Sequence, residues 1–218
     1  PIGAIAIGNA LKKLDYDVIY VTDEFSEPPI RQVLSEDDKL EIFPMQNSND
    51  SKTTAAKMIK DINPNIIISI ERCGPTIDGD YLNSRGKKIA EFNSKADILL
   101  NHNIPSIGIG DGGNEIGMGN LTHIIKNSDK LSNPPCITET DILIPASTSN
   151  WGGYGLVAGL SKITNKPLLP SILEDEKLIK DFVDAGGVDG ITATSSYKID
   201  SFELEVNSSI LDRLHKLF

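Results

Sequence analysis

Short runs of apolar, largely β-branched residues recur along this chain, and stretches with helical spacing separate them. A run that is apolar at consecutive positions fits a strand buried on both faces, because a half-exposed strand alternates apolar and polar residues. Such strands joined through helices predict an α/β fold, with a mostly parallel sheet and helices on both faces. The expected strands are Val18–Val21, Leu40–Phe43, Ile66–Ile70, Ser106–Ile109 and Asp141–Pro145.

The intervening helices are predicted from apolar residues that lie three or four positions apart. They are expected over residues 5–14, 53–62, 90–101, 151–160, 174–185 and 202–217. No low-complexity linker, charge block or internal repeat interrupts the pattern, so we predict one domain over residues 1–218. Because Pro1 stands at what reads as the entry to a helix, we expect an upstream strand and loop to precede it.

Charge and cysteine content exclude several classes of protein. The formal net charge of -10 would repel phosphate backbones and anionic lipids, so neither nucleic acid nor a membrane is an expected partner. Cys73 and Cys136 are the two cysteines, too few for a disulfide framework and outside any zinc-ligand spacing. Cys73 lies in a polar loop, where it is either a bystander or a reactive thiol. With no long apolar run or basic leader, we expect a soluble, cytoplasmic protein.

The run Ile107–Asn120 combines six glycines with two carboxylates and two amides, directly after a predicted buried strand. Glycine lets a ligand approach the backbone, so we interpret this loop as the active site. The amides of Gly112, Gly113 and Asn114 could face an oxyanion or a carboxylate, although a tight structural turn is the alternative. The run matches neither the dinucleotide fingerprint nor the P-loop, and its acids would repel a pyrophosphate.

Asp111 and Glu115 lie four residues apart, which places them close together in a helix or a turn. Two adjacent carboxylates in a partly dry cleft repel each other, so one pKa rises and acid and base forms coexist near neutrality. The pair could instead hold a hard cation, with Asn114, Asn120 or Asp78 completing the oxygen ligands. A solvated acidic turn is the third interpretation, and the sequence leaves all three open.

The loop Glu71–Gly86 follows another predicted strand and carries two arginines. Ligands in parallel α/β sheets bind beyond the carboxyl ends of the strands, so this loop should adjoin the glycine-rich one. Arg72 or Arg85 could clamp a substrate carboxylate, or could form an internal salt bridge with Glu71. Neutral hydrogen bonds to a substrate could come from Tyr81 and Asn83.

Two further segments contain candidate site residues. Ser149, Asn150 and Trp151 follow the last predicted strand; either polar residue could be a helix N-cap, and the tryptophan could wall a pocket. Asp189 stands among glycines and could reach the same cleft, although a helix C-terminal turn explains those glycines equally well.

Taken together, these loops resemble the carboxyl-terminal domain of the D-glutamate cyclase family, over nearly the whole chain. Two departures from the family pattern stand out. The family has Glu-Thr-Asp-Gly-Pro before the Gly3-Ala4 position, whereas this chain begins at Pro1, and it tends to lack cysteine where Cys73 stands. The segments that carry the resemblance are Ile107–Asn120, Glu71–Gly79 with Tyr81, Asn83 and Arg85-Gly86, Ser149–Tyr154, and Val188–Thr192.

The resemblance implies that the α-amine of D-glutamate attacks its own γ-carboxyl carbon, giving 5-oxo-D-proline and water. An intramolecular attack needs no nucleotide activation and no cofactor, although a divalent cation at Asp111, Glu115 and Asp78 stays open. We assign Asp111 and Glu115 as the acid/base pair and the amides of Gly112 and Gly113 as oxyanion donors. Arg72 or Arg85 is the expected clamp for the α-carboxylate.

The alternatives are a metal-dependent hydrolase and a non-catalytic binding module for a small carboxylate. In each case the expected partner is a small amino acid or carboxylate, and the chain could form a homo-oligomer. The expected substrate-binding residues are Glu71, Arg72, Asp78, Tyr81, Asn83, Arg85, Gly112, Gly113, Asn114, Ser149, Asn150, Trp151 and Asp189.

Overall fold

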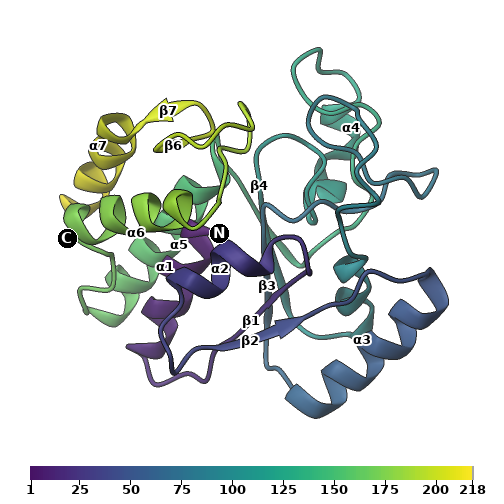
Figure 1. Cartoon of the computed structure of the whole chain (residues 1–218), viewed down its shortest axis with the longest axis horizontal. Helices are drawn as coiled ribbons and strands as arrows, with labels where there is room; N and C mark the ends of the chain where they lie inside the picture. Colours follow the sequence, from purple (N-terminus) through teal and green to yellow (C-terminus); the bar gives the residue numbers. More distant parts are fainter. Residues whose placement is uncertain (218) are drawn as a thin grey trace. The chain divides into compact units, whose positions relative to one another are not determined.

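The computed structural model describes residues 1–217, which divide into two compact units (Figure 1). We call Thr22–Phe25 with Ile42–Ser149 the central unit, and Pro1–Val21, Ser26–Glu41 and Asn150–Phe218 the terminal unit. The single domain predicted over residues 1–218 stays a prediction, now with two compact parts.

A parallel sheet of three strands forms the centre of the central unit. The strands β3 (Ile67–Ile70), β4 (Ser106–Gly110) and β5 (Ile142–Pro145) follow each other in that order across the sheet. All residues of β4 are buried, so this strand is covered on both faces, as its continuous apolar run predicted. The register pairs Ile70 with Ile109 and Gly110 with Pro145. The loops that follow the three strands therefore begin at the same edge of the sheet.

Helical segments pack beside this sheet in the central unit. Helix α3 (Ser48–Ile62) begins at Asn47, whose side chain accepts hydrogen bonds from the backbone NH groups of Asn49 and Asp50. Helix α3 lies against the 3₁₀ helix η1 (Ala96–His102), and between them Phe43, Ala55, Ile98 and Leu99 form a small core. The short segments η2 (Met118–Leu121) and α4 (Thr122–Ile125) follow the glycine-rich loop.

The helix predicted over residues 90–101 was wrong in its first half, because residues 90–95 are not helical. Asn93 and Ser94 are buried there, and their polar groups bond within the unit rather than in a helix. The Asn93 amide donates to the Ser94 carbonyl at 3.0 Å, and that carbonyl also accepts from Arg72. These side-chain bonds replace the backbone bonds of a helix, which therefore begins only at Ala96.

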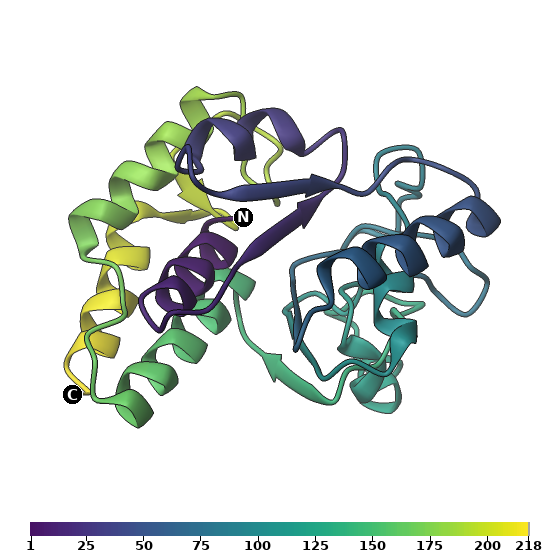
Figure 2. The same cartoon turned by 90° about the horizontal axis from the view of Figure 1, so that it is seen from below.

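The terminal unit is mainly helical. Helix α6 contacts α1, α2 and α7, and Figure 2 shows α1, α5, α6 and α7 gathered together. The predicted helix over residues 202–217 begins only at Leu204, because Phe202–Glu203 pairs antiparallel with Lys198–Ile199. The bounds are α1 (Ile2–Lys12), α2 (Glu27–Val33), α5 (Ser149–Thr164, whose first residue belongs to the central unit), α6 (Ile172–Asp184), β6 (Lys198–Ile199), β7 (Phe202–Glu203) and α7 (Leu204–His215).

A chain of buried polar groups joins three helices of the terminal unit. The Tyr154 hydroxyl donates to one carboxylate oxygen of Asp175 at 2.7 Å, and the Asn207 amide donates to the other oxygen at 2.7 Å. The Trp151 indole NH donates to the Asn207 carbonyl oxygen at 2.9 Å. Because each member has a partner, these groups fix how α5, α6 and α7 pack.

The first two strands, β1 (Ile19–Thr22) and β2 (Lys39–Ile42), form a separate two-stranded sheet. The prediction of a mostly parallel α/β sheet therefore holds for three strands and is too broad for the others. In β2 exposed and half-buried residues alternate, which is typical of a strand with one face in solvent. Its sequence, Lys-Leu-Glu-Ile, carries that alternation and distinguishes it from the interior strand β4.

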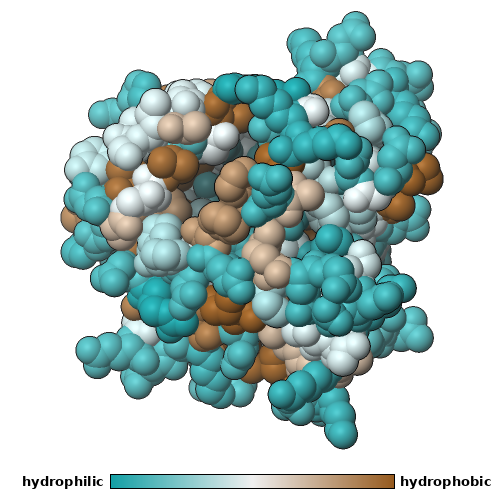
Figure 3. All heavy atoms as spheres, turned by 45° about the vertical axis from the view of Figure 1, so that its right-hand side comes forward, coloured by the Kyte–Doolittle hydropathy of each residue, from teal (hydrophilic) through white to brown (hydrophobic). Residues whose placement is uncertain are grey.

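The face drawn in Figure 3 is largely hydrophilic, with hydrophobic residues scattered in small groups. Within residues 1–217, no helix combines the length and the apolar character that crossing a bilayer requires.

Candidate active site

The carboxyl edge of the β3–β4–β5 sheet brings together the starts of three loops. The backbone NH of Glu71 donates to Ile109 O at 3.0 Å, and that of Ala146 donates to Gly110 O at 3.0 Å, so both loops leave beside β4. Glu71 has a left-handed backbone, with φ of 57°, which is uncommon for a residue other than glycine. A carboxylate oxygen of Glu71 lies within 4.8 Å of one of Asp111. This edge therefore gathers acidic side chains, as the topology predicted.

The carboxylate of Asp111 is held by the first residue of α5. The backbone NH of Ser149 donates to Asp111 Oδ2 at 2.6 Å, and the Ser149 hydroxyl donates to the same oxygen at 2.7 Å. Ser149 is fully buried and Asp111 is half-buried. Two short donors on one carboxylate oxygen make a charge-assisted contact that fixes the side chain in place.

The second carboxylate, on Glu115, is buried inside its own loop. The NH groups of Gly112 and Gly113 donate to its two oxygens, each at 2.8 Å. Burial is the main cause that raises the pKa of Glu115 to about 7, and the neighbouring charge of Asp111 adds to it. Asp111 and Glu115 thus form a pair in a turn, and the Glu115 carboxyl can hold or release a proton near neutral pH.

Glycines in this loop are required by close packing. A Cβ on Gly108 would lie 2.8 Å from the backbone of Ile116 and Gly117, because the loop folds back directly over β4. Gly113 has φ of 95°, a conformation that side chains rarely allow. Glycine therefore permits the turn that places Glu115 under the amides of its own loop.

The predicted oxyanion donors do not point at open space in this structure. The amides of Gly112 and Gly113 already have Glu115 as their acceptor, so a substrate oxygen could use them only if that carboxylate turned away. The backbone carbonyl of Asn114 accepts a hydrogen bond from Gly74 NH at 2.9 Å, which connects the glycine-rich loop to the loop that follows β3. The amides of Gly112 and Gly113 therefore face Glu115 here, and their role as oxyanion donors stays a prediction.

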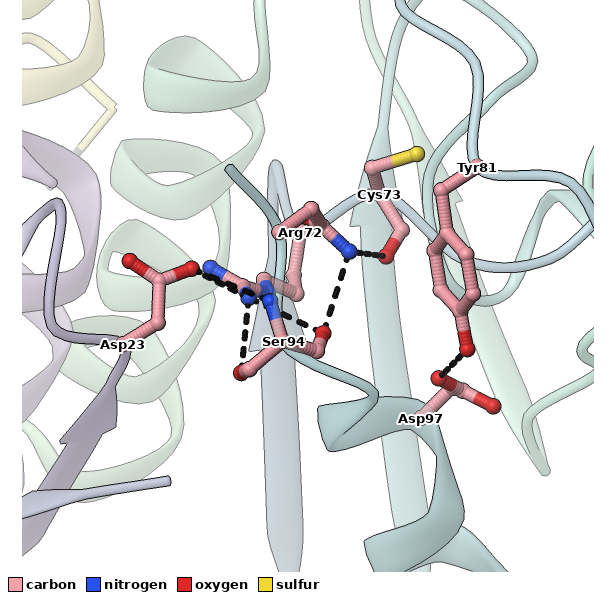
Figure 4. A network of polar contacts seen from close by, with 7 residues as sticks. Asp23, Arg72, Cys73, Tyr81, Ser94 and Asp97 are labelled. Carbon is pink, nitrogen blue, oxygen red and sulfur yellow. Dashed lines mark hydrogen bonds and ion pairs between the residues drawn. The ribbon is translucent and has the colours of Figure 1, made fainter. Parts of the chain in front are cut away.

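Arg72 forms an internal ion pair, but not with the predicted partner. Its guanidinium lies 2.5 Å from the carboxylate of Asp23 and also donates to the carbonyl and the hydroxyl of Ser94, at 3.0 and 2.9 Å (Figure 4). Asp23 is fully buried, so this pair is shielded from solvent. The ion pair is the internal salt bridge that the sequence left open for Arg72, and a role of Arg72 as a substrate clamp stays a prediction. Arg85, which is exposed, stays the candidate clamp.

The neighbouring side chains of this loop are also engaged internally. The Tyr81 hydroxyl donates to the buried Asp97 carboxylate at 2.6 Å (Figure 4). Burial raises the pKa of the Cys73 thiol to about 12, and its sulfur contacts the Leu82 carbonyl at 3.1 Å. A thiol with this pKa stays protonated at neutral pH, which favours the interpretation of Cys73 as a bystander.

Two polar turns complete the first loop. The Asn83 side-chain oxygen accepts from the NH groups of Arg85 and Lys87, each at 3.0 Å, and so shapes its own turn. Asp78 lies on an exposed turn. Within residues 1–217, neither Asp78 nor Glu115 joins a group of three His, Cys, Asp or Glu side chains whose ligand atoms lie within 4.8 Å of one another. A cation site completed by Asn114 or Asn120 stays a prediction.

The candidates in the terminal unit bond within that unit. Asn150 accepts from Gly3 NH at 2.6 Å, and Trp151 bonds Asn207 and packs on Phe202 with ring centroids 4.9 Å apart. Asp189 accepts from Thr192 NH at 2.7 Å and from Ser201 NH at 2.9 Å. Burial opposes ionisation of Asp189, yet these donors outweigh it and lower its pKa. These three residues hold their own segments in place.

Sequence reasoning missed the residues that support the site. Asp23, Ser94 and Asp97 bind Arg72 and Tyr81 from distant segments, and nothing in the local patterns identifies them as partners. One weak signal exists for Asp23, since an acid that directly follows a predicted strand lies where ligand loops begin.

A sequence model of the family described as D-glutamate cyclase-like, C-terminal, matches residues 1–215 of this chain. The human protein named D-glutamate cyclase, mitochondrial, is 30% identical over 166 residues, which are 62% of this chain and 26% of the human protein. The matched chain thus spans about a quarter of the length of that relative.

Proposed function

Because this chain belongs to the D-glutamate cyclase-like, C-terminal family, we propose that it converts D-glutamate into 5-oxo-D-proline and water. The single observation that carries the proposal is the pair of Asp111 and Glu115 at the carboxyl edge of the parallel sheet. One carboxylate is held by Ser149, and burial keeps the other near its protonation midpoint at neutral pH. An acid and a base side by side are what lactam formation requires.

In the proposed reaction the substrate enters with an α-ammonium and a γ-carboxylate. Asp111 accepts a proton from the ammonium, and the freed nitrogen lone pair forms a bond to the γ-carbon. The departing oxygen receives two protons, one from protonated Glu115 and one that Asp111 took from the ammonium, and the carbon–oxygen bond breaks so that water leaves. The ring nitrogen gives its second proton to the ionised Glu115, and both side chains return to their starting protonation states.

The intramolecular geometry lowers the activation barrier of this reaction. Nitrogen and γ-carbon belong to one molecule, so holding the substrate in a folded conformation avoids the entropy cost of bringing two reactants together. Arg85, an exposed residue that follows Ser84 in the turn beside Gly112, is the proposed anchor for the α-carboxylate. A charged anchor on the α-carboxylate would hold the substrate in the folded conformation.

The test is a turnover assay that follows 5-oxoproline from D-glutamate and, separately, from L-glutamate. Asp111→Asn and Glu115→Gln should each lower kcat by about a hundredfold or more, the usual contribution of a positioned acid or base. Glu91→Gln is the matched control, because it neutralises an exposed carboxylate of the same unit. Full activity in both site variants, or no turnover by the unaltered chain, would defeat the proposal.

The same assay separates the alternatives. Activity that a chelator abolishes would favour a metal-dependent hydrolase, whereas tight binding of D-glutamate without turnover would favour a binding module. We propose that no cofactor is needed, since every proton transfer above uses a side chain. A cytoplasmic location, a small amino acid as partner and a homo-oligomer stay predictions.

A further inference from the structure

Ser149 makes contacts that a substrate-binding residue would not need. Its hydroxyl and its backbone NH both converge on the same oxygen of Asp111, at 2.7 and 2.6 Å. The side chain is fully buried, so it has little surface to offer a substrate. Its neighbour Thr148 is equally buried, yet within residues 1–217 the Thr148 hydroxyl oxygen has no hydrogen-bond partner. Two adjacent hydroxyls therefore differ in one respect, the bond to Asp111.

We propose that Ser149 is a positioning residue that holds the Asp111 carboxylate beside Glu115 and so assigns the base role to Asp111 and the acid role to Glu115. This inference rests on the function proposed above. It moves Ser149 from the predicted substrate-binding residues to the support of the acid/base pair.

The need for such a support follows from the charges around Asp111. Glu71 approaches from the end of β3, within 4.8 Å between carboxylate oxygens, and Glu115 lies in the same loop. From the neighbouring turn, Ser84 lies beside Gly112 and Arg85 follows it in sequence. The carboxylates of Glu71 and Glu115 repel an ionised Asp111. The glycines on either side of Asp111 restrict its backbone less than other residues would, so this repulsion could displace the side chain. The two donors from Ser149 counter that repulsion.

The position of Asp111 in turn controls Glu115. The charge of Asp111 is the second cause, after burial, that raises the pKa of Glu115. If the Asp111 carboxylate moved away, Glu115 would lose part of this effect and would release its proton at a lower pH. Ser149 therefore affects the pKa of Glu115 through its hydrogen bonds to Asp111, without contacting the reacting nitrogen or γ-carbon of the substrate.

The experiment compares three variants of the whole chain. Ser149→Ala should lower kcat by about tenfold or more with little change in KM, because misplacing a catalytic group affects the chemical step. Thr148→Val removes the equally buried neighbouring hydroxyl and should leave kcat within about twofold. Ser149→Thr keeps a hydroxyl at the same place and should recover most of the activity. Equal losses in Thr148→Val and Ser149→Ala would overturn the inference.

A pH profile gives a readout that a structural role alone would not move. The alkaline limb of kcat should shift to lower pH in Ser149→Ala, on the order of half a unit. An unchanged limb would contradict the inference even if kcat fell. Should Ser149→Ala fail to fold, Ser149→Gly removes the same hydroxyl at a helix start that tolerates glycine.

A crystal structure of the Ser149→Ala variant tests the inference without any turnover. The Asp111 carboxylate should leave the position it occupies in the unaltered chain, and an unmoved carboxylate would refute the positioning role. If the unaltered chain makes no 5-oxoproline, the proposed function fails, while the crystallographic comparison still decides whether Ser149 holds Asp111.

Discussion

The guanidinium of Arg72 lies 2.5 Å from the carboxylate of Asp23, although the two residues are far apart in the sequence. Asp23 is completely shielded from solvent, and 19% of the Arg72 side chain is exposed. An ion pair in such a place does little for net stability as a whole, yet removing one partner leaves an uncompensated charge. This relationship gives the first prediction.

Asp23→Ala should destabilise the chain by about 3 to 5 kcal/mol, because the Arg72 charge would stay buried without its counterion. Urea unfolding followed by circular dichroism measures this change. The control is Asp80→Ala, which breaks the exposed pair between Asp80 and Lys88 and should cost less than about 1 kcal/mol. Similar losses in both variants would show that burial does not distinguish the two pairs.

The stability of the chain should fall as pH rises from about 5 to 8, partly because of Glu115. Its folded-state pKa of about 7 lies above the ordinary value of 4.5, so the folded chain keeps a proton that the unfolded chain releases. This contribution is complete below pH 4.5 and is lost as pH passes 7; it amounts to about 3 kcal/mol at most. Glu115→Gln should flatten the slope, and Glu91→Gln should not. Parallel slopes in all three proteins would remove Glu115 as the cause.

Turnover should decline above pH 7, since in the proposed reaction protonated Glu115 delivers a proton to the departing oxygen and its pKa is about 7. The fall should approach tenfold per pH unit once the carboxyl is mostly ionised. Rates measured with saturating D-glutamate between pH 5 and 9 give this limb. A rate that keeps rising through pH 8 would mean that another group supplies the proton.

Gly108→Ala should destabilise the central unit by about 1 to 3 kcal/mol or more and should reduce activity, because its Cβ would meet the backbone of the glycine-rich loop at 2.8 Å. Gly155→Ala is the contrasting control. Among residues 1–217, and apart from the adjoining backbone of α5 itself, no heavy atom lies within 4 Å of a Cβ at that exposed position, so alanine should stabilise the helix by about 0.5 to 1 kcal/mol. Thermal unfolding of both variants checks the two signs, and a stabilising Gly108→Ala would contradict the packing argument.

Local patterns were sufficient where the responsible interactions are local. The buried strand β4 follows from an uninterrupted apolar run, and the turn after it follows from its glycines. The family resemblance drawn from those loops is confirmed. Asp111 and Glu115 were predicted from their spacing to lie together, and in the structure the charge of Asp111 is close enough to raise the pKa of Glu115.

The errors arose where distant segments compete for the same polar groups. Arg72 forms its ion pair with Asp23 and not with the adjacent Glu71, because the fold buries the Asp23 carboxylate beside the guanidinium. Residues 90–95 are not helical, because the Asn93 amide donates to the Cys73 carbonyl and the Ser94 carbonyl accepts from Arg72. Ser149 stands at the start of α5 as predicted, but its acceptor Asp111 comes from a different loop and was not predicted. Pairings of this kind depend on tertiary contacts that no single stretch of sequence contains.

The segment Thr22–Phe25 makes the central unit discontinuous along the chain, and it carries Asp23. A fragment cloned from residue 42 to residue 149 would include Arg72 and lack its counterion. Anyone who excises this half for crystallisation or for transplantation into another scaffold would need to graft that short segment back, or to replace the arginine with a neutral side chain.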